Sequence, residues 1–141
     1  MRTNVARVAD VDIGSTKCYI LNMLNRIFKT DSFSKEAKKS DIADKVLCAA
    51  IKEIQLGQAD DLGRGVWKKP LNKNQDRSII LAKGGKYWIF QYLFHKKDRE
   101  NIDQAELKEF KKLAKIFEKI TTAQIVALLE HKDLVEICHD C

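Results

Sequence analysis

The stretch RSIILAKGGKYWIFQYLFHKKDR, residues 77–99, has the pattern of a β-hairpin. Two runs rich in β-branched and aromatic residues, 78–83 and 86–94, flank Gly84-Gly85, a pair that favours a two-residue turn with positive φ. Arg77 stands at the start of the hairpin, and the second run is followed by His95, Lys96, Lys97 and Arg99. We therefore expect positive charge at one end of the two strands, and we take that end as the working end.

The second run of the hairpin is apolar on both of its alternating faces. Trp88, Phe90, Tyr92 and Phe94 alternate with Tyr87, Ile89, Gln91 and Leu93. Because successive side chains of a strand point to opposite faces, the first four are expected on one face and the others on the second. This pattern predicts a central strand that is covered on both sides.

The residues before the hairpin predict a strand, a helical hairpin and a second strand. The run 24–29 alternates as a strand, and helices are expected over about 31–39, capped by Asp31 or Ser32, and over 42–56, capped by Ser40 or Asp41. A turn rich in Asp and Gly covers 58–65. The run GVWKKPL, 65–71, then reads as a strand whose pairing Pro70 limits.

The residues after the hairpin predict two helices and an edge strand. Asp103 and Glu106 have the spacing of a capping box for a helix to about 119, and Thr121 or Thr122 caps a helix over 123–131. The run DLVEIC, 133–138, is a candidate edge strand. The expected fold class is α+β, a small antiparallel sheet of three to four strands packed by an N-terminal helical hairpin and C-terminal helices. Residues 1–22 are expected to be a disordered tail or upstream extension, with one domain over 23–141.

The charge of the chain is concentrated in one segment. The 141 residues carry a net charge of +6, whereas residues 62–99 contain ten Lys or Arg against Asp76 and Asp98, which gives +8 for that segment and −2 for the rest. A cationic field this local favours a polyanionic partner such as nucleic acid or an acidic protein. The alternative is a solvated basic face without a partner.

The four cysteines do not have the pattern of a secreted disulfide framework. Cys48 lies in an apolar helical run and is expected to be a small buried hydrophobe. Cys138 and Cys141 have the C-x-x-C spacing of half a metal site, but no second pair completes it, so no metal is predicted. With no apolar run long enough to span a membrane and no secretory segment, we expect a cytoplasmic protein without a membrane partner.

Three runs of the sequence resemble the RelE-type toxins of bacterial type II toxin–antitoxin systems, in the phage-related branch of the RelE/ParE superfamily. They are LNRIFKT (24–30), GVWKKPLNKNQDRSIILAKGGKYWIFQYLFHKKDRENID (65–103) and DLVEIC (133–138). The resemblance covers Met23 to about Asp140 in order. It implies a RelE-like fold and a metal-independent endoribonuclease without cofactors, which cuts mRNA, usually on the ribosome. It also implies inhibition by an antitoxin, expected to be a helix-turn-helix protein from the adjacent gene.

The resemblance also identifies candidate site residues. The family's basic active-site positions correspond to Lys68, Lys69, Arg77, Lys96 and Arg99. Other candidate RNA contacts, on charge and position, are Arg64, Lys73, Lys97 and His95. Metal-free RNA cleavage needs the 2′-hydroxyl deprotonated, the phosphate stabilised and the leaving oxygen protonated. We expect Lys68 or Lys69 to act as the base and Arg77 and Arg99 to hold the phosphate. Lys96 is a candidate proton donor or second electrostatic partner.

Two departures from the family pattern leave other functions open. Pro70 stands where an Arg is expected, and Asp76 stands where a His is expected. One alternative is therefore a weakened remnant that only binds its antitoxin or nucleic acid, and another is a ParE-like toxin that poisons DNA gyrase on the same fold. For His95, both a local bond at the strand end and an acid–base role remain possible readings.

Overall fold

The computed structural model describes residues 25–84 and 86–138. In chain order their elements are β1 (Arg26–Thr30), α3 (Asp31–Lys39), α4 (Asp44–Gln55), β2 (Asp60–Gly63), β3 (Val66–Leu71), β4 (Asp76–Lys83), β5 (Tyr87–His95), α5 (Gln104–Glu118), α6 (Thr122–Glu130) and β6 (Leu134–Ile137). The α+β class is confirmed, with every predicted helix present. Residues 1–22, the predicted tail, lie outside the described residues.

The described part forms one six-stranded sheet in the order β2-β3-β4-β5-β1-β6. The pair β1–β5 is parallel, and the other pairs are antiparallel. The predicted count of three or four strands was too low for this sheet of six. The strand β2 was missed, because its sequence DDLG reads as a turn and carries no alternation of apolar residues, and the candidate edge strand near the C-terminus also belongs to the sheet as β6. The run 134–137 is an edge strand beside β1, as predicted.

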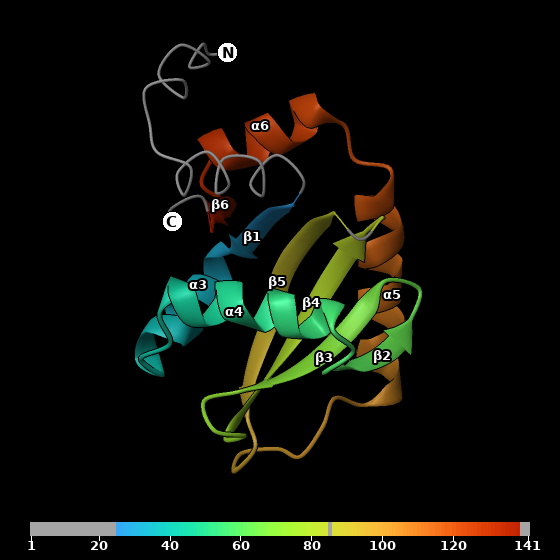
Figure 1. Cartoon of the computed structure of the whole chain (residues 1–141). Helices are drawn as coiled ribbons and strands as arrows, with labels where there is room; N and C mark the ends of the chain where they lie inside the picture. The colour runs from blue at the N-terminus through green and yellow to red at the C-terminus, as the bar shows by residue number, and fades with distance from the viewer. Residues whose placement is uncertain (1–24, 85, 139–141) are drawn as a thin grey trace.

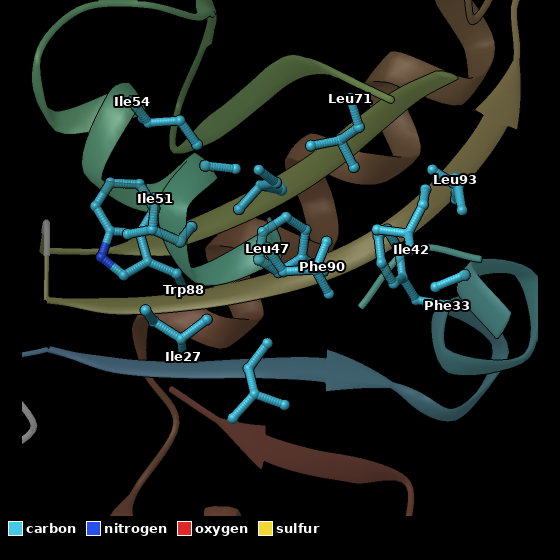
Figure 2. Packing of buried hydrophobic residues seen from close by; sticks show 14 residues of the cluster. Ile27, Phe33, Ile42, Leu47, Ile51, Ile54, Leu71, Trp88, Phe90 and Leu93 are labelled. Carbon is cyan, nitrogen blue, oxygen red and sulfur yellow. The ribbon is translucent and has the colours of Figure 1, made fainter. Parts of the chain in front are cut away.

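Helices cover both faces of the sheet. Figure 1 shows α4 crossing in front of the strands and α5 running behind them. The front core joins α3 and α4 to the sheet through Phe33, Leu47 and Ile51, which pack against Trp88 and Phe90 of β5. Figure 2 shows these side chains between helix and sheet, and the Phe33 and Phe90 rings lie 5.2 Å apart. The rear core is formed by α5 and α6, with Phe117 and Ile125 against Phe28 and Ile79.

The strand β5 changes faces halfway along its length. Trp88 and Phe90 lie in the front core, whereas Phe94 and the partly buried Tyr92 lie in the rear core. The prediction that these four residues share one face was therefore wrong. Pairing with β4 shifts between Ile79↔Tyr92 and Ile80↔Phe90, so Gln91 is an extra residue. Such a bulge reverses the alternation after it, and it sets which face each later side chain occupies.

The hairpin connection and two helix starts also differ from the predictions. Between Lys83 and Tyr87 the connection has three residues, 84–86, rather than two. The N-cap of α3 is Thr30, whose hydroxyl accepts from the Phe33 amide, and not Asp31 or Ser32. The helix α4 starts after Ala43, which offers no side-chain cap, and not after Ser40 or Asp41. Asp103 and Thr121 cap α5 and α6 as predicted.

A disulfide joins Cys48 of α4 to Cys138, which directly follows β6. Their Cα atoms lie 5.5 Å apart, and the sequence separation of the two cysteines is 90. Cys48 is therefore not the free buried hydrophobe that the sequence predicts, because a pairing over this separation leaves no local signal. Cys141, the other half of the C-x-x-C pair, lies outside the described residues. Within residues 25–84 and 86–138, no cluster of three His, Cys, Asp or Glu could hold a metal ion. None of the helices in that part is long and apolar enough to cross a membrane.

Candidate functional site

Lys68 and Lys69 are neighbours in β3, and their side chains lie on opposite faces of the sheet, as alternation requires. Lys69 points to the front, where its Nζ lies 2.9 Å from Glu53 Oε1 of α4 and donates to the Gln58 carbonyl at 3.0 Å. Only 8% of Lys69 is exposed. Lys68 points to the rear, where Nζ donates to Asn101 Oδ1 at 3.4 Å and lies 3.7 Å from Asp60 Oδ2. Only Lys68 is therefore placed to meet a ligand.

Lys68, Arg77 and Arg99 come together on the rear face of the sheet, and we call these three residues the α5-side cluster. Lys68 of β3 is paired with Ile79 of β4, and Ile79 is paired in turn with Tyr92 of β5. Arg77 of β4 is paired with Phe94 of β5 in the next row of side chains on the same face. Arg99 reaches the same rows, since its guanidinium lies 5.7 Å from the Phe94 ring centre. The bulge in β5 makes this possible, because it moves the two aromatic rings to the rear.

Contacts with α5 hold Arg99 in one orientation. Its Nη1 donates to Glu106 Oε2 at 2.9 Å, its Nη2 donates to Glu106 Oε1, and Nη1 also reaches the Tyr92 hydroxyl at 3.4 Å. Its Nε donates to the Asn101 carbonyl at 3.1 Å. The hydrogen bond to Glu106 raises the pKa of Arg99, and the same bond, with one from the Asp103 amide, lowers the pKa of Glu106. Arg99 is thus a fixed cation beside the other two.

Arg77 is oriented by backbone groups alone. Its Nη1 donates to the Asn74 carbonyl at 2.8 Å and to the Asp76 carbonyl at 3.3 Å. No carboxylate of the described residues forms an ion pair with it. A guanidinium has five N–H donors in a planar fork that suits phosphate oxygens, so the remaining donors of Arg77 are available for an anion.

A second group of candidate residues lies at the same end of the sheet but opens to the front. The loops 72–75 and 96–99 follow β3 and β5 at the lower end of the sheet in Figure 1. Together with the end of α3 they line a cavity of about 1080 Å³, which we call the α3-side pocket. Lys73, His95, Lys96 and Lys97 all line this pocket.

The pocket and the cluster share an edge. Asn74 lines the α3-side pocket and also accepts the hydrogen bond from Arg77. Of the predicted RNA contacts, Arg64 lies far from both the pocket and the cluster. It follows β2 in the turn before Val66, and Val66 pairs with Leu81 near the opposite end of β4.

Comparison with known proteins gives the family of the chain. The family model described as RelE toxin of RelE / RelB toxin-antitoxin system matches residues 25–137. The chain belongs to the RelE toxin family. No curated protein and no solved structure matched the chain. This RelE-family chain is therefore the toxin component of a toxin–antitoxin pair, and an antitoxin is its partner.

Several residues around the RelE-family site were not selected from the sequence. Asn101 bridges Lys68 and Arg99, and the Tyr92 hydroxyl contacts Arg99. Ser40 and Asp76 contact the His95 ring, and Asp76 is 3% exposed. Ser40 carries no sequence signal, because 55 residues separate it from His95. The contact of Tyr92 with Arg99 could have been predicted only together with the bulge, which places the Tyr92 ring on the rear face.

Proposed function

We propose that this RelE-family toxin is a metal-independent endoribonuclease that cuts mRNA in association with the ribosome and thereby inhibits translation. The observation that supports it is the α5-side cluster, in which Lys68, Arg77 and Arg99 gather on one face at the loop end of the sheet. Preorganised cations of this kind stabilise the charge that builds on phosphate oxygens during RNA cleavage. The site of action would then be the cytoplasm, whose reducing conditions disfavour the disulfide between Cys48 and Cys138.

The cluster suggests a role for each cation. Arg77, with its free donors, binds the phosphate on two oxygens. Arg99, held by Glu106 and Tyr92, offers a fixed positive charge beside it. Lys68 makes only long contacts and can turn toward the substrate. Lys69 takes no part in this proposal, because its ammonium is buried and paired with Glu53.

The position of Asp76 argues against a weakened remnant. An acid within the α5-side cluster would oppose phosphate binding, but the Asp76 side chain faces the other way and is paired with His95 and Asn72. Pro70 does lie beside Arg77 in the register, where it supplies no charge. No observation on the described surface favours the gyrase-poisoning alternative.

Induced expression in bacteria tests the proposal. The wild-type chain should stop growth, with translation stalled and mRNA fragmented, while Lys68→Ala and Arg77→Ala should restore growth. Lys52→Ala is the matched control, because Lys52 is an exposed lysine on α4. Filamentation with DNA damage would point to gyrase instead, and normal growth with the wild-type chain would indicate a remnant. Toxicity unchanged in both cluster variants would reject the ribonuclease.

Binding to RNA offers a second measurement. Contacts to phosphates release counterions, so the affinity should fall steeply with salt concentration. Each lost phosphate contact reduces the slope of log affinity against log salt by roughly 0.7 to 0.9. We expect this reduction in Arg77→Ala and no reduction in Lys52→Ala. An affinity that does not respond to salt would argue against any nucleic-acid partner.

A further inference from the structure

His95 is the centre of a hydrogen-bonded chain that the α5-side cluster does not use. Its Nδ1 contacts Asp76 Oδ1, and its Nε2 lies 3.4 Å from Ser40 Oγ. The Asp76 side chain is 4% exposed, and its second oxygen accepts from Asn72 Nδ2 at 3.0 Å. Three separate elements, α3, β4 and β5, therefore meet at one imidazole ring.

This arrangement fixes what each ring nitrogen can do. A buried carboxylate next to Nδ1 keeps the proton on that nitrogen and orients the ring. In the neutral form, the lone pair is then on Nε2, which points toward the α3-side pocket, and the His95 side chain is 29% exposed. His95 is thus oriented to exchange protons with a group in the pocket.

The charged side chains around His95 favour an anionic ligand in the α3-side pocket. Four lysines line the pocket, Lys39 from the end of α3, Lys73 from the loop 72–75, and Lys96 and Lys97 from the loop after β5. Against them stand the exposed Asp98 and the buried Asp76, which already has two partners. A cavity lined by an excess of cations concentrates phosphate groups.

Ser, His and Asp are also the residue types of the catalytic triad of serine hydrolases. The position of Ser40, however, argues against a serine nucleophile. Ser40 is the C-cap of α3, where the carbonyl end of the helix disfavours an anion. The backbone amides of Ser40, Asp41 and Ile42 all donate to carbonyls of α3, so none of the three can stabilise an oxyanion. The Ser40 hydroxyl, 3.4 Å from Nε2, has to turn away before a substrate hydroxyl can take its place.

We propose that the α3-side pocket binds an RNA phosphodiester and that His95 is a catalytic acid–base residue there, with Asp76 as its positioning residue. This inference rests on the proposed ribonuclease function. Arg77 of the α5-side cluster, which donates to the Asn74 carbonyl at the shared edge, stabilises the charge of the same phosphodiester from the other side of that edge. His95 suits proton abstraction better than Lys68, because an ammonium group must lose a proton before it can accept one.

The reaction balances with groups on the protein. His95 Nε2 takes the proton of the 2′-hydroxyl, and the 2′-oxygen forms a bond to phosphorus. The bond between phosphorus and the 5′-oxygen breaks, and the leaving oxygen takes a proton from the Lys96 ammonium. The products are a 2′,3′-cyclic phosphate and a 5′-hydroxyl. His95 then passes its proton through water to Lys96, which restores both groups.

Cleavage of a defined RNA by purified variants tests the catalytic role. His95→Asn keeps an N–H that can donate to Asp76, so the fold should persist, which circular dichroism checks. We expect a loss of about 100-fold or more in rate, in the range of general acid–base catalysis. The slope of rate against pH on the acid side should also disappear. His131→Ala, at an exposed histidine, should cleave like the wild type, and imidazole should rescue His95→Ala.

Other variants separate the alternatives. Asp76→Asn should lower the rate and change the pH profile, whereas Ser40→Ala should leave cleavage within a few-fold of the wild type. A loss in Ser40→Ala as deep as that in His95→Asn would overturn the proposal in favour of a serine nucleophile. Unchanged cleavage and pH profile in His95→Asn would overturn it outright.

Ligand binding distinguishes failure of this inference from failure of the ribonuclease proposal. Cytidine 3′-monophosphate, titrated into the wild-type chain, should shift the NMR resonances of the His95 ring but not those of His131. Lys73→Ala should weaken this shift, and Lys52→Ala should not. A His95 shift without RNA cleavage would reject the ribonuclease and keep the phosphate site. No shift at His95 would reject the α3-side pocket as a phosphate site.

Discussion

The two faces of the sheet use the same residue types differently. On the front face Lys69 is paired with Glu53, and Lys29 is paired with Asp44 at 2.7 Å. On the rear face Arg77 has no carboxylate partner among the described residues, and Lys68 makes only long contacts. The two paired lysines on the front therefore attach helix α4 to the sheet, whereas Arg77 and Lys68 on the rear are available to a ligand, beside Arg99, which is paired with Glu106. Lys68 and Lys69, adjacent in sequence, fall on the two sides of this division.

At the loop end of the sheet the contrast takes another form. The α5-side cluster offers fixed cations and the hydroxyl of Tyr92. The α3-side pocket offers exposed lysines around a histidine that is oriented by a buried carboxylate. The first arrangement suits charge stabilisation, and the second suits proton transfer. A single RNA strand lying over this end could use both.

The largest effect on stability is expected from the disulfide, which ties α4 to β6 on the front side. Because it closes a loop of 90 residues, its loss should lower the free energy of unfolding by about 4 kcal/mol. Cys48→Ser, measured by urea denaturation, should show this loss, and hydrogen exchange should rise in α4 more than in α5. A reducing agent should lower the wild-type midpoint to that of the variant. Equal midpoints with and without reductant would contradict the prediction.

The next largest effect is expected on the rate of RNA cleavage, from a substitution of Arg77 on the rear face. Arg77→Ala removes the cation of the α5-side cluster that has only backbone partners among the described residues. The rate of RNA cleavage should fall by about 10²- to 10³-fold, as for the loss of a preorganised donor. Arg77→Lys should recover part of this activity, since it restores the charge but not the fork. Initial rates on a defined RNA give the measurement. Arg64→Ala, at the other end of the sheet, is the control and should retain wild-type rates.

A matched pair of lysine variants tests the division between the faces directly. Lys69→Ala removes a buried ammonium with its ion pair to the half-exposed Glu53 and its hydrogen bond to a carbonyl, so it should destabilise the fold by about 1.5 to 3 kcal/mol. Lys68→Ala should change stability by about 0.5 kcal/mol or less but reduce RNA cleavage. Urea unfolding and cleavage rates, measured on both variants, give the comparison. Equal effects of the two variants on both quantities would remove the distinction.

The smallest effect is expected from Glu106, through pH. The hydrogen bond from Arg99 lowers the pKa of Glu106 in the folded state. Stability from this carboxylate is therefore fully present above the unfolded value of about 4.3 and is lost as pH falls through the lowered folded value. Glu106→Gln should flatten that part of the acid unfolding curve while keeping an acceptor for the Asp103 amide. Glu118→Gln, on the same helix and exposed, should leave the curve unchanged.

Local patterns were enough to predict most of the elements. Asp103 and Glu106 predicted the capping box of α5, and Thr121 predicted the start of α6, because caps depend on residues three positions apart. The pattern failed where a partner strand decides the outcome. DDLG became β2 only by pairing with β3, and the Gln91 bulge arose from the register between β4 and β5.

The sequence by itself determined the order of the helices and of every strand except β2, the concentration of positive charge in residues 62–99, and the residues that carry the RelE resemblance. Only the tertiary structure decided which of those cations meet. In the folded chain Lys69 lies on the front face and Lys68 on the rear face. Arg99 contacts Tyr92, and Ser40 contacts His95, which is 55 residues away in sequence. The physical reason is that side-chain direction depends on strand register and loop closure, which no local stretch of chain specifies.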